Sequence, residues 1–182
     1  DLSPNAILEG LVALASQGIP VEALREDCFS QRKIAHWVAR ILEQMEAFFQ
    51  KGGEKLSQIG SQNSKTLETL NALKDMRQDL EEMNGFSPEE LQKVFEKIRQ
   101  RWDTCATRVA DWRRGKFTDG ERSLLDNREE FSLHADVIHG WMDHLRNLKP
   151  ILFISAQKVL AQLLESLYER MRSKGIVTFG GI

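Results

Sequence analysis

The sequence predicts an all-α protein, an elongated up-and-down bundle of five to six helices with coiled-coil-like packing. Three observations lead to this fold class. Apolar residues recur at gaps of three and four along most of the 182 residues, which is the spacing of one face of a helix. Prolines stand where helices would begin, and glycines stand where helices would end.

Capping residues mark the predicted helix starts. Ser3 directly precedes a proline, while Ser87 and Glu90, and likewise Thr118 and Glu121, stand three residues apart. This spacing is a capping box, in which the two side chains satisfy backbone N–H groups that have no partner in the first turn. The sequence therefore predicts three well-defined helix starts at these places.

Glycines that could take the left-handed conformation mark the predicted helix ends. They are Gly18, Gly52, Gly53, Gly85 and Gly175. Between the start and stop signals we expect helices over 4–17, 20–51, 54–84, 88–114, 119–148 and 150–174. We expect breaks near 27–30 in the second and at the polar run 60–65 in the third.

The segment 88–114 carries a complete heptad seam with alternating gaps of 4 and 3, formed by Leu91, Phe95, Ile98, Trp102, Cys105, Val109 and Trp112. At about 1.5 Å per residue, this helix and the one over 119–148 would each be about 40 Å long, which makes the bundle elongated. We expect the core to contain Trp37, Phe48, Leu73, Phe95, Trp102, Trp112, Phe131, Trp141 and Leu163.

The length of the chain suits one domain with a substantial core, and we expect a single helical-bundle domain over 1–174. The tail 175–182 has a composition typical of a strand and could begin a following domain. Because the chain starts at Asp1 rather than at a methionine, we expect it to be either a fragment of a longer protein or a processed chain.

Three of the four histidines, His134, His139 and His144, fall within one predicted helix. Each stands five residues from the next, which rotates the side chain by about 140° around the helix. Metal ligands on one helix need a spacing of three or four residues, so the pattern predicts no metal site. We expect His134 at the core or its boundary; the alternative is a single ligand completed from another helix, by Cys105 or Glu130.

Residue patterns of catalysis are absent from the sequence. Cys28 and Cys105 lack the close pairing of a zinc site or a disulfide framework, and we expect both to be buried thiols. The run KGGEK, residues 51–55, lacks the strand and the G-K-[ST] ending of a phosphate-binding loop. We therefore expect no enzyme activity and no cofactor.

A net charge of -2 at pH 7 gives the chain no overall attraction to nucleic acid or anionic lipid. The segment 98–117 combines basic residues with Trp102 and Trp112, a composition that suits nucleic acid or phosphoinositide. Because both tryptophans fall on the apolar seam, we interpret the segment as a solvated helix flank. The longest apolar-rich run, 151–164, is shorter than the roughly 20 residues that cross a bilayer, so membrane binding is not indicated.

By elimination, we expect a soluble, non-catalytic protein–protein interaction or assembly module, a scaffold within a larger cytoplasmic protein. Its partner would be another protein or a second copy, with no small-molecule ligand. One alternative is a ligand-sensing bundle in which Asn63, Asn127 and His134 line an internal pocket. Another is a secreted effector or toxin whose amphipathic helices rearrange at membranes.

The predicted interaction surface lies on the last helix, whose apolar positions cover more than the single stripe that an outer helix needs. The first helix is its expected internal partner. Where that partner leaves the last helix uncovered, we expect a docking or dimerisation patch formed by Phe153, Leu160, Leu164 and Tyr168.

Overall fold

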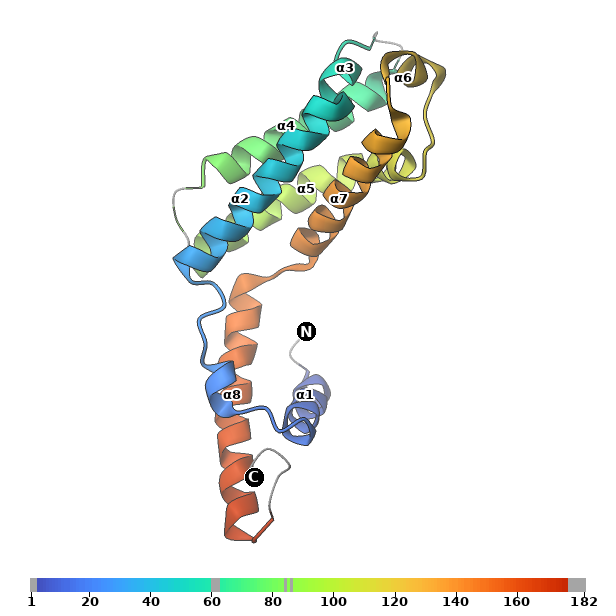
Figure 1. Cartoon of the computed structure of the whole chain (residues 1–182). Helices are drawn as coiled ribbons and strands as arrows, with labels where there is room; N and C mark the ends of the chain where they lie inside the picture. Colours follow the sequence, from blue (N-terminus) through green and yellow to red (C-terminus); the bar gives the residue numbers. More distant parts are fainter. Residues whose placement is uncertain (1–2, 60–62, 84, 86, 177–182) are drawn as a thin grey trace. The chain divides into compact units, whose positions relative to one another are not determined.

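The computed structural model describes residues 3–59, 63–83, 85 and 87–176, and every regular element in these residues is helical (Figure 1). The predicted all-α helical bundle is confirmed. The elements are α1 (Pro4–Ser16), η1 (Val21–Leu24), α2 (Gln31–Phe48), η2 (Phe49–Gly53), α3 (Glu54–Leu56), α4 (Ser64–Glu81), α5 (Pro88–Arg113), α6 (Asp119–Leu124), α7 (Arg128–Asn147) and α8 (Pro150–Ser173). The η1 segment is a 3-10 turn and η2 a π-helical turn.

The chain forms two compact units, where the sequence pattern predicts one domain over 1–174. Unit 1 comprises residues 1–28 and 149–182, and unit 2 comprises residues 29–148. Helical periodicity shows which face of each helix is apolar but not which helix covers it, so it does not reveal this division. Most of the strand-like tail, residues 177–182, lies outside the described residues.

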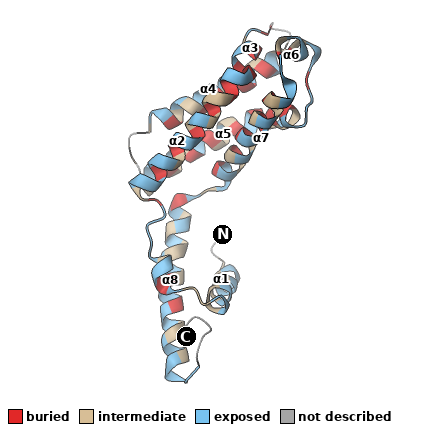
Figure 2. Ribbon diagram, viewed as in Figure 1, coloured by how far each residue is buried: buried red, intermediate tan, exposed pale blue. Residues whose placement is uncertain are grey.

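Unit 2 is a bundle built around α5, which packs against α4 on one side and α7 on the other, while α2 packs against α7. Figure 2 shows buried residues on the helix faces that meet. All seven residues of the predicted α5 seam are buried. Near one end of the bundle, the ring centroids of Phe48 and Phe131 lie 4.9 Å apart. The Trp112 ring meets the Phe131 ring edge-on, with 5.6 Å between the centroids.

The predicted core is largely confirmed in unit 2. Phe48, Leu73, Phe95, Trp102, Trp112 and Phe131 are buried. Trp37 and Trp141 are only half-buried, and their rings meet edge-on at 5.9 Å. Leu163, in unit 1, was predicted in the core but is 40% exposed, because it lies on the flank of α8 and not on its buried stripe.

Unit 1 is built from α1, η1 and α8. The buried residues of its hydrophobic cluster are Val21, Ala161 and Leu164, packed against the partly buried Leu11, Leu14, Ala15, Leu24, Leu167 and Tyr168. The Tyr168 hydroxyl also donates a hydrogen bond to the backbone oxygen of Ile19 at 2.8 Å. The expected pairing of the first helix with the last is confirmed, although α1 itself buries no residue completely.

The predicted helix starts are confirmed by their hydrogen bonds. Ser3 caps α1 by accepting from the backbone of Ala6 at 3.3 Å. Ser87 with Glu90, and Thr118 with Glu121, form complete capping boxes at the starts of α5 and α6. At the helix ends, Gly18 and Gly175 take positive φ values of 65° and 69°, as predicted.

Three predicted segments contain breaks. Those over 20–51 and 54–84 break near the expected places, since α2 begins at Gln31 and α4 at Ser64. The prediction of one unbroken helix over 119–148 is wrong. Leu125 is extended, with φ −93° and ψ 117°, and Asn127 caps a new helix by accepting from the backbone of Glu130 at 3.1 Å.

The predicted helix stop at Gly52 and Gly53 is confirmed by a kink: Gly52 has φ 171° and ψ −24°, which are not helical, and α3 begins directly after Gly53. This φ is extended and not left-handed, and both glycines are buried between α2 and α3. A Cβ atom added at Gly52 would lie 2.5 Å from Leu125 and 2.6 Å from Phe131. Gly52 is therefore a packing position, where the absence of a side chain lets η2 approach the start of α7.

Candidate functional site

Helix α8 carries two apolar stripes, and unit 1 covers one of them. The covered stripe includes Ala161, Leu164 and Tyr168, which face α1 and η1. Leu164 is fully buried and Tyr168 half-buried. Two residues of the predicted docking patch therefore contribute to the internal core of unit 1.

We call the second stripe of α8 the outer stripe; it consists of Leu152, Ala156, Val159 and Leu163. Their gaps of 4, 3 and 4 repeat the rhythm of a coiled-coil seam. Leu163 stands one residue before Leu164 and is thus rotated by about 100° from the buried stripe. Val159 and Leu163 are 38% and 40% exposed, whereas Leu152 and Ala156 are half-buried.

The other two predicted patch residues have different environments. Phe153 is 46% exposed. Leu160 is half-buried and lies between the two stripes, where α1 comes close: a Cβ atom added at Gly10 would be 3.8 Å from Leu160. The sequence prediction named two residues of the covered stripe, Leu164 and Tyr168, and none of the outer stripe. It therefore omitted Val159 and Leu163, although their spacing was visible in the sequence.

Helix α1 adds a second exposed apolar surface to unit 1. Leu8 and Val12 are 59% and 58% exposed and stand four residues apart, so they lie on one face. Leu11 and Leu14 point instead to the core of unit 1. The apolar surface of α1 is therefore wider than its contact with α8.

Polar groups of unit 1 gather on another side of α8. Arg25 forms an ion pair with Glu165 at 2.8 Å, and the Gln157 side-chain amide donates to the backbone oxygen of Glu26 at 2.9 Å. A hollow of about 440 Å³ beside these contacts has Leu24 and Ala161 among its lining residues. The polar residues Gln157 and Glu165 of α8 thus contact the 25–28 segment, on a different side of the helix from the outer stripe.

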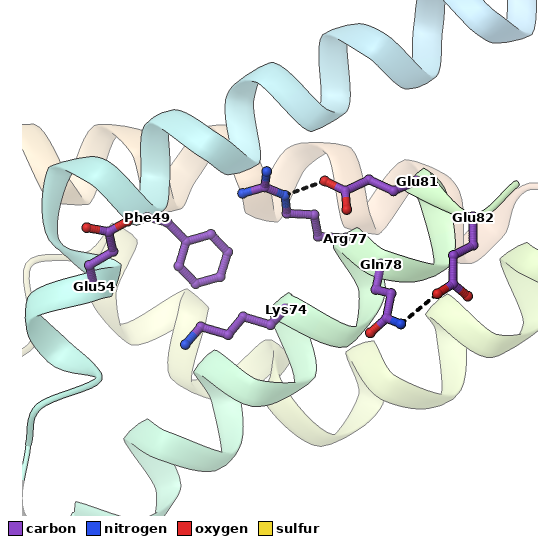
Figure 3. Close-up of a pocket in the computed structure, with 7 residues that line it drawn as sticks. All are labelled: Phe49, Glu54, Lys74, Arg77, Gln78, Glu81 and Glu82. Atoms are coloured by element: carbon purple, nitrogen blue, oxygen red, sulfur yellow. Dashed lines mark hydrogen bonds and ion pairs between the residues drawn. The ribbon is translucent and has the colours of Figure 1, made fainter.

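Unit 2 has a separate groove of about 570 Å³ between η2 and α4, lined by Phe49, Glu54, Lys74, Arg77, Gln78, Glu81 and Glu82 (Figure 3). Arg77 donates to Glu81 at 2.7 Å and also to Glu46. The hydrogen bond from Arg77 holds the pKa of Glu46 below its usual value. Arg77 is therefore held between two carboxylates at the edge of this groove.

The three clustered histidines lie in different surroundings. His134 is half-buried and His144 is exposed. The His139 ring meets Trp102 edge-on at 5.4 Å, and its Nδ1 lies 3.2 Å from Asp143 and 2.9 Å from Arg113. Burial lowers the pKa of His139. Among the residues that the structure describes, no group of three His, Cys, Asp or Glu side chains is arranged to hold a metal ion.

The two cysteines differ. Cys105 is buried on the α5 seam, and its burial raises the pKa of the thiol to about 12. Cys28 is exposed, which corrects the prediction of a buried thiol. The reason is local: Cys28 lies in the non-helical link before α2, not on an apolar helix face.

The basic segment 98–117 is tied into unit 2 by acidic partners. Arg101 pairs with Asp79 at 3.0 Å, Arg113 pairs with Asp136 at 3.1 Å, and Arg108 pairs with the buried Glu121. Asn127, proposed above as a pocket residue, instead caps α7. These contacts favour structural roles for the basic residues of 98–117 and for Asn127, which the sequence alone suggested as ligand-binding residues.

Comparisons with models of protein families, with curated proteins and with solved structures find no match to this chain. In the described part of the chain, no helix combines the length and apolar character needed to cross a membrane.

Proposed function

We propose that this chain is a non-catalytic protein–protein interaction module whose contact surface lies on α1 and α8 of unit 1. One observation supports this most directly, namely the uneven distribution of large exposed apolar side chains. Unit 2 exposes Leu133 and Val137, whereas unit 1, the smaller of the two, exposes Leu8, Val12, Ile151, Phe153, Val159, Leu163 and Ile176.

Apolar surface left in water costs about 25 cal/mol per Å² relative to burial. Soluble proteins keep contiguous apolar patches small, and larger ones usually mark contacts with other molecules. In unit 1, Leu8 and Val12 stand four residues apart on α1, and Val159 and Leu163 stand four residues apart on α8. The two members of each pair therefore lie on the same face of their helix. Paired exposed positions of this kind suit a helical protein partner better than a small polar ligand.

The test compares three matched double substitutions, each of which adds two glutamates four residues apart on a helix. Two of them change unit 1, Leu8→Glu with Val12→Glu and Val159→Glu with Leu163→Glu. The control, Leu133→Glu with Val137→Glu, changes exposed residues of α7 in unit 2. Circular dichroism first establishes that all three chains remain helical.

Each chain is then immobilised and exposed to an extract of the cells that make it. Any protein retained by the wild type is purified, and its affinity for every variant is measured. We expect at least one unit 1 double variant to lose binding tenfold or more, while the control binds as the wild type does. Equal binding to all variants, or no protein retained by the wild type and no self-association, would contradict the proposal. Flotation of the chain with anionic liposomes would instead support the membrane-active alternative.

A further inference from the structure

The outer stripe of α8 has the form of half a coiled coil. In coiled coils, side chains spaced by alternating gaps of three and four insert between those of a second helix. Leu152, Ala156, Val159 and Leu163 have this spacing, and the last two are substantially exposed. The complementary surface is therefore another helix with an apolar stripe of similar length.

We propose that the helix bound there is α8 of a second copy of this chain, running antiparallel across a twofold axis. This inference rests on the proposed interaction function and specifies its partner. A twofold interface must be self-complementary, because the same residues serve both sides of the contact. The outer stripe and its surroundings meet this requirement in two respects, side-chain size and charge.

The sizes match in the antiparallel direction. With the axis placed between Gln157 and Lys158, the symmetric spacing puts Leu152 opposite Leu163 and Ala156 opposite Val159. Each small side chain then faces a larger one, and the leucines meet at the two ends. A parallel pair would place Ala156 opposite Ala156 and leave the centre underpacked, which costs stability in any apolar contact.

The charges also permit self-association. Ser155, Gln162 and Ser166, which border the outer stripe on one side, are uncharged. Leu160, which borders it on the other side, is apolar. The nearest acidic group along the helix, Glu165, points away to its ion pair with Arg25. Lys158, the charged residue beside the axis, stands about 100° from Val159 around the helix and so lies off the outer stripe. Two copies can therefore approach without bringing like charges together.

The outer stripe predicts a weak dimer. Its four residues extend over about 16 Å of helix, so the area buried would fall below the roughly 800 Å² per partner of standard stable interfaces. We therefore expect a dissociation constant of about 10 µM or weaker.

The experiment is sedimentation velocity of the full chain from about 5 to about 500 µM, a range set around this expected affinity. We expect reversible dimerisation by the wild type and by the control with Leu133→Glu and Val137→Glu. The variant with Val159→Glu and Leu163→Glu should bind at least tenfold more weakly while keeping the helical circular dichroism of the wild type. A wild type that stays monomeric throughout would overturn the inference. If that monomer still bound a different protein through unit 1, the proposed function would stand without it.

The antiparallel arrangement has a separate test by disulfide trapping. In a Cys28→Ser background, chains carrying Leu152→Cys are mixed with chains carrying Leu163→Cys and oxidised. We expect cross-linking in the mixture, and little in either chain alone, because positions 152 and 163 face each other across the axis. Cross-linking of each chain with itself, and none between the two, would contradict the antiparallel pairing.

Discussion

Glu121 shows how one side chain can serve both local structure and the core. Its spacing from Thr118 predicts a capping box, but the structure also places its carboxylate fully inside unit 2. It accepts hydrogen bonds from Thr66 at 2.6 Å and from the Trp112 ring N–H at 3.0 Å, and pairs with Arg108. The sequence could not reveal this second role, because Thr66 lies 55 residues away.

The surroundings of Glu121 predict how the stability of unit 2 depends on pH. Burial alone would raise the pKa of this carboxyl, but the hydrogen bonds from Thr66, Thr118 and Trp112 and the charge of Arg108 together lower it. The stabilisation is therefore complete above the pKa of the unfolded chain and is lost as the pH falls through the lower pKa of the folded chain. Urea unfolding between pH 7 and pH 3 should show this acid-side loss.

The substitution that tests this role of Glu121 is Glu121→Gln, which removes the negative charge paired with Arg108. We expect a loss of about 3 kcal/mol at pH 7, since one partner of a buried ion pair is left uncompensated. The variant should also lose less stability than the wild type on acidification. Glu129→Gln, at an exposed position of α7, is the control and should change the stability at pH 7 little. Equal acid sensitivity of wild type and Glu121→Gln would refute this role.

Substituting alanine for Gly52 and for Gly140 should change the stability of unit 2 in opposite directions. Gly52→Ala should destabilise unit 2 by about 1–3 kcal/mol, because the added methyl would overlap Leu125 and Phe131. Gly140→Ala should stabilise it by about 0.5–1 kcal/mol, because Gly140 is exposed within α7 and its added Cβ would meet no atom within 4 Å. Thermal unfolding measures both. A neutral Gly52→Ala variant would show that η2 is not tightly packed.

At the scale of the helices, strong periodicity and capping were predictable, and interruptions imposed by packing were not. The α5 seam from Leu91 to Trp112 is continuous in the sequence and buried throughout. The break before α7 has neither proline nor glycine, and its one signal in the sequence is the cap residue Asn127 with Glu130 three residues later. Leu125 leaves the helix and becomes buried, close to the space that Gly52 leaves open, a contact between residues distant in sequence.

In the candidate site, too, the periodicity was predictable from the sequence and the packing was not. Both apolar stripes of α8 follow from the spacing of its residues. Which stripe α1 covers depends on packing, such as the close approach of Gly10 to Leu160. This is why the predicted patch included the buried Leu164 and left out the exposed Leu163.

The start of α7 gives a prediction for a single helix. The Asn127 side chain is the cap that re-initiates the helix after Leu125. Asn127→Ala should cost about 1 kcal/mol of unfolding free energy, the usual value of such a cap. Asn127→Asp keeps an acceptor and should retain most of the stability. Chemical denaturation distinguishes the two, and equal losses would show that the hydrogen bond does not hold the helix start.

At the scale of the whole molecule, the two units have cores of very different size. In the described residues, the core of unit 1 is built on Val21, Ala161 and Leu164, whereas the core of unit 2 contains the fully buried aromatic residues Phe48, Phe95, Trp102, Trp112 and Phe131. All four tryptophans lie in unit 2, and the single tyrosine, Tyr168, lies in unit 1. Tryptophan fluorescence therefore reports on the unfolding of unit 2 alone.

We expect unit 1 to unfold at a lower urea concentration than unit 2, because less apolar area stabilises it. Far-UV circular dichroism should show two transitions, and tryptophan fluorescence should follow only the second. Coincident transitions by both methods would indicate that the chain unfolds as one cooperative domain.

The measurement that tests the central claim most directly is this urea titration repeated at about 5 and about 200 µM protein, below and above the expected dissociation constant. Association through unit 1 stabilises only the folded form of that unit, so the midpoint of the first transition should rise with concentration. The tryptophan-detected midpoint should stay constant, and Val159→Glu with Leu163→Glu should abolish the shift. A midpoint of the first transition that does not change with concentration, or a shift confined to the tryptophan signal, would contradict self-association through α8.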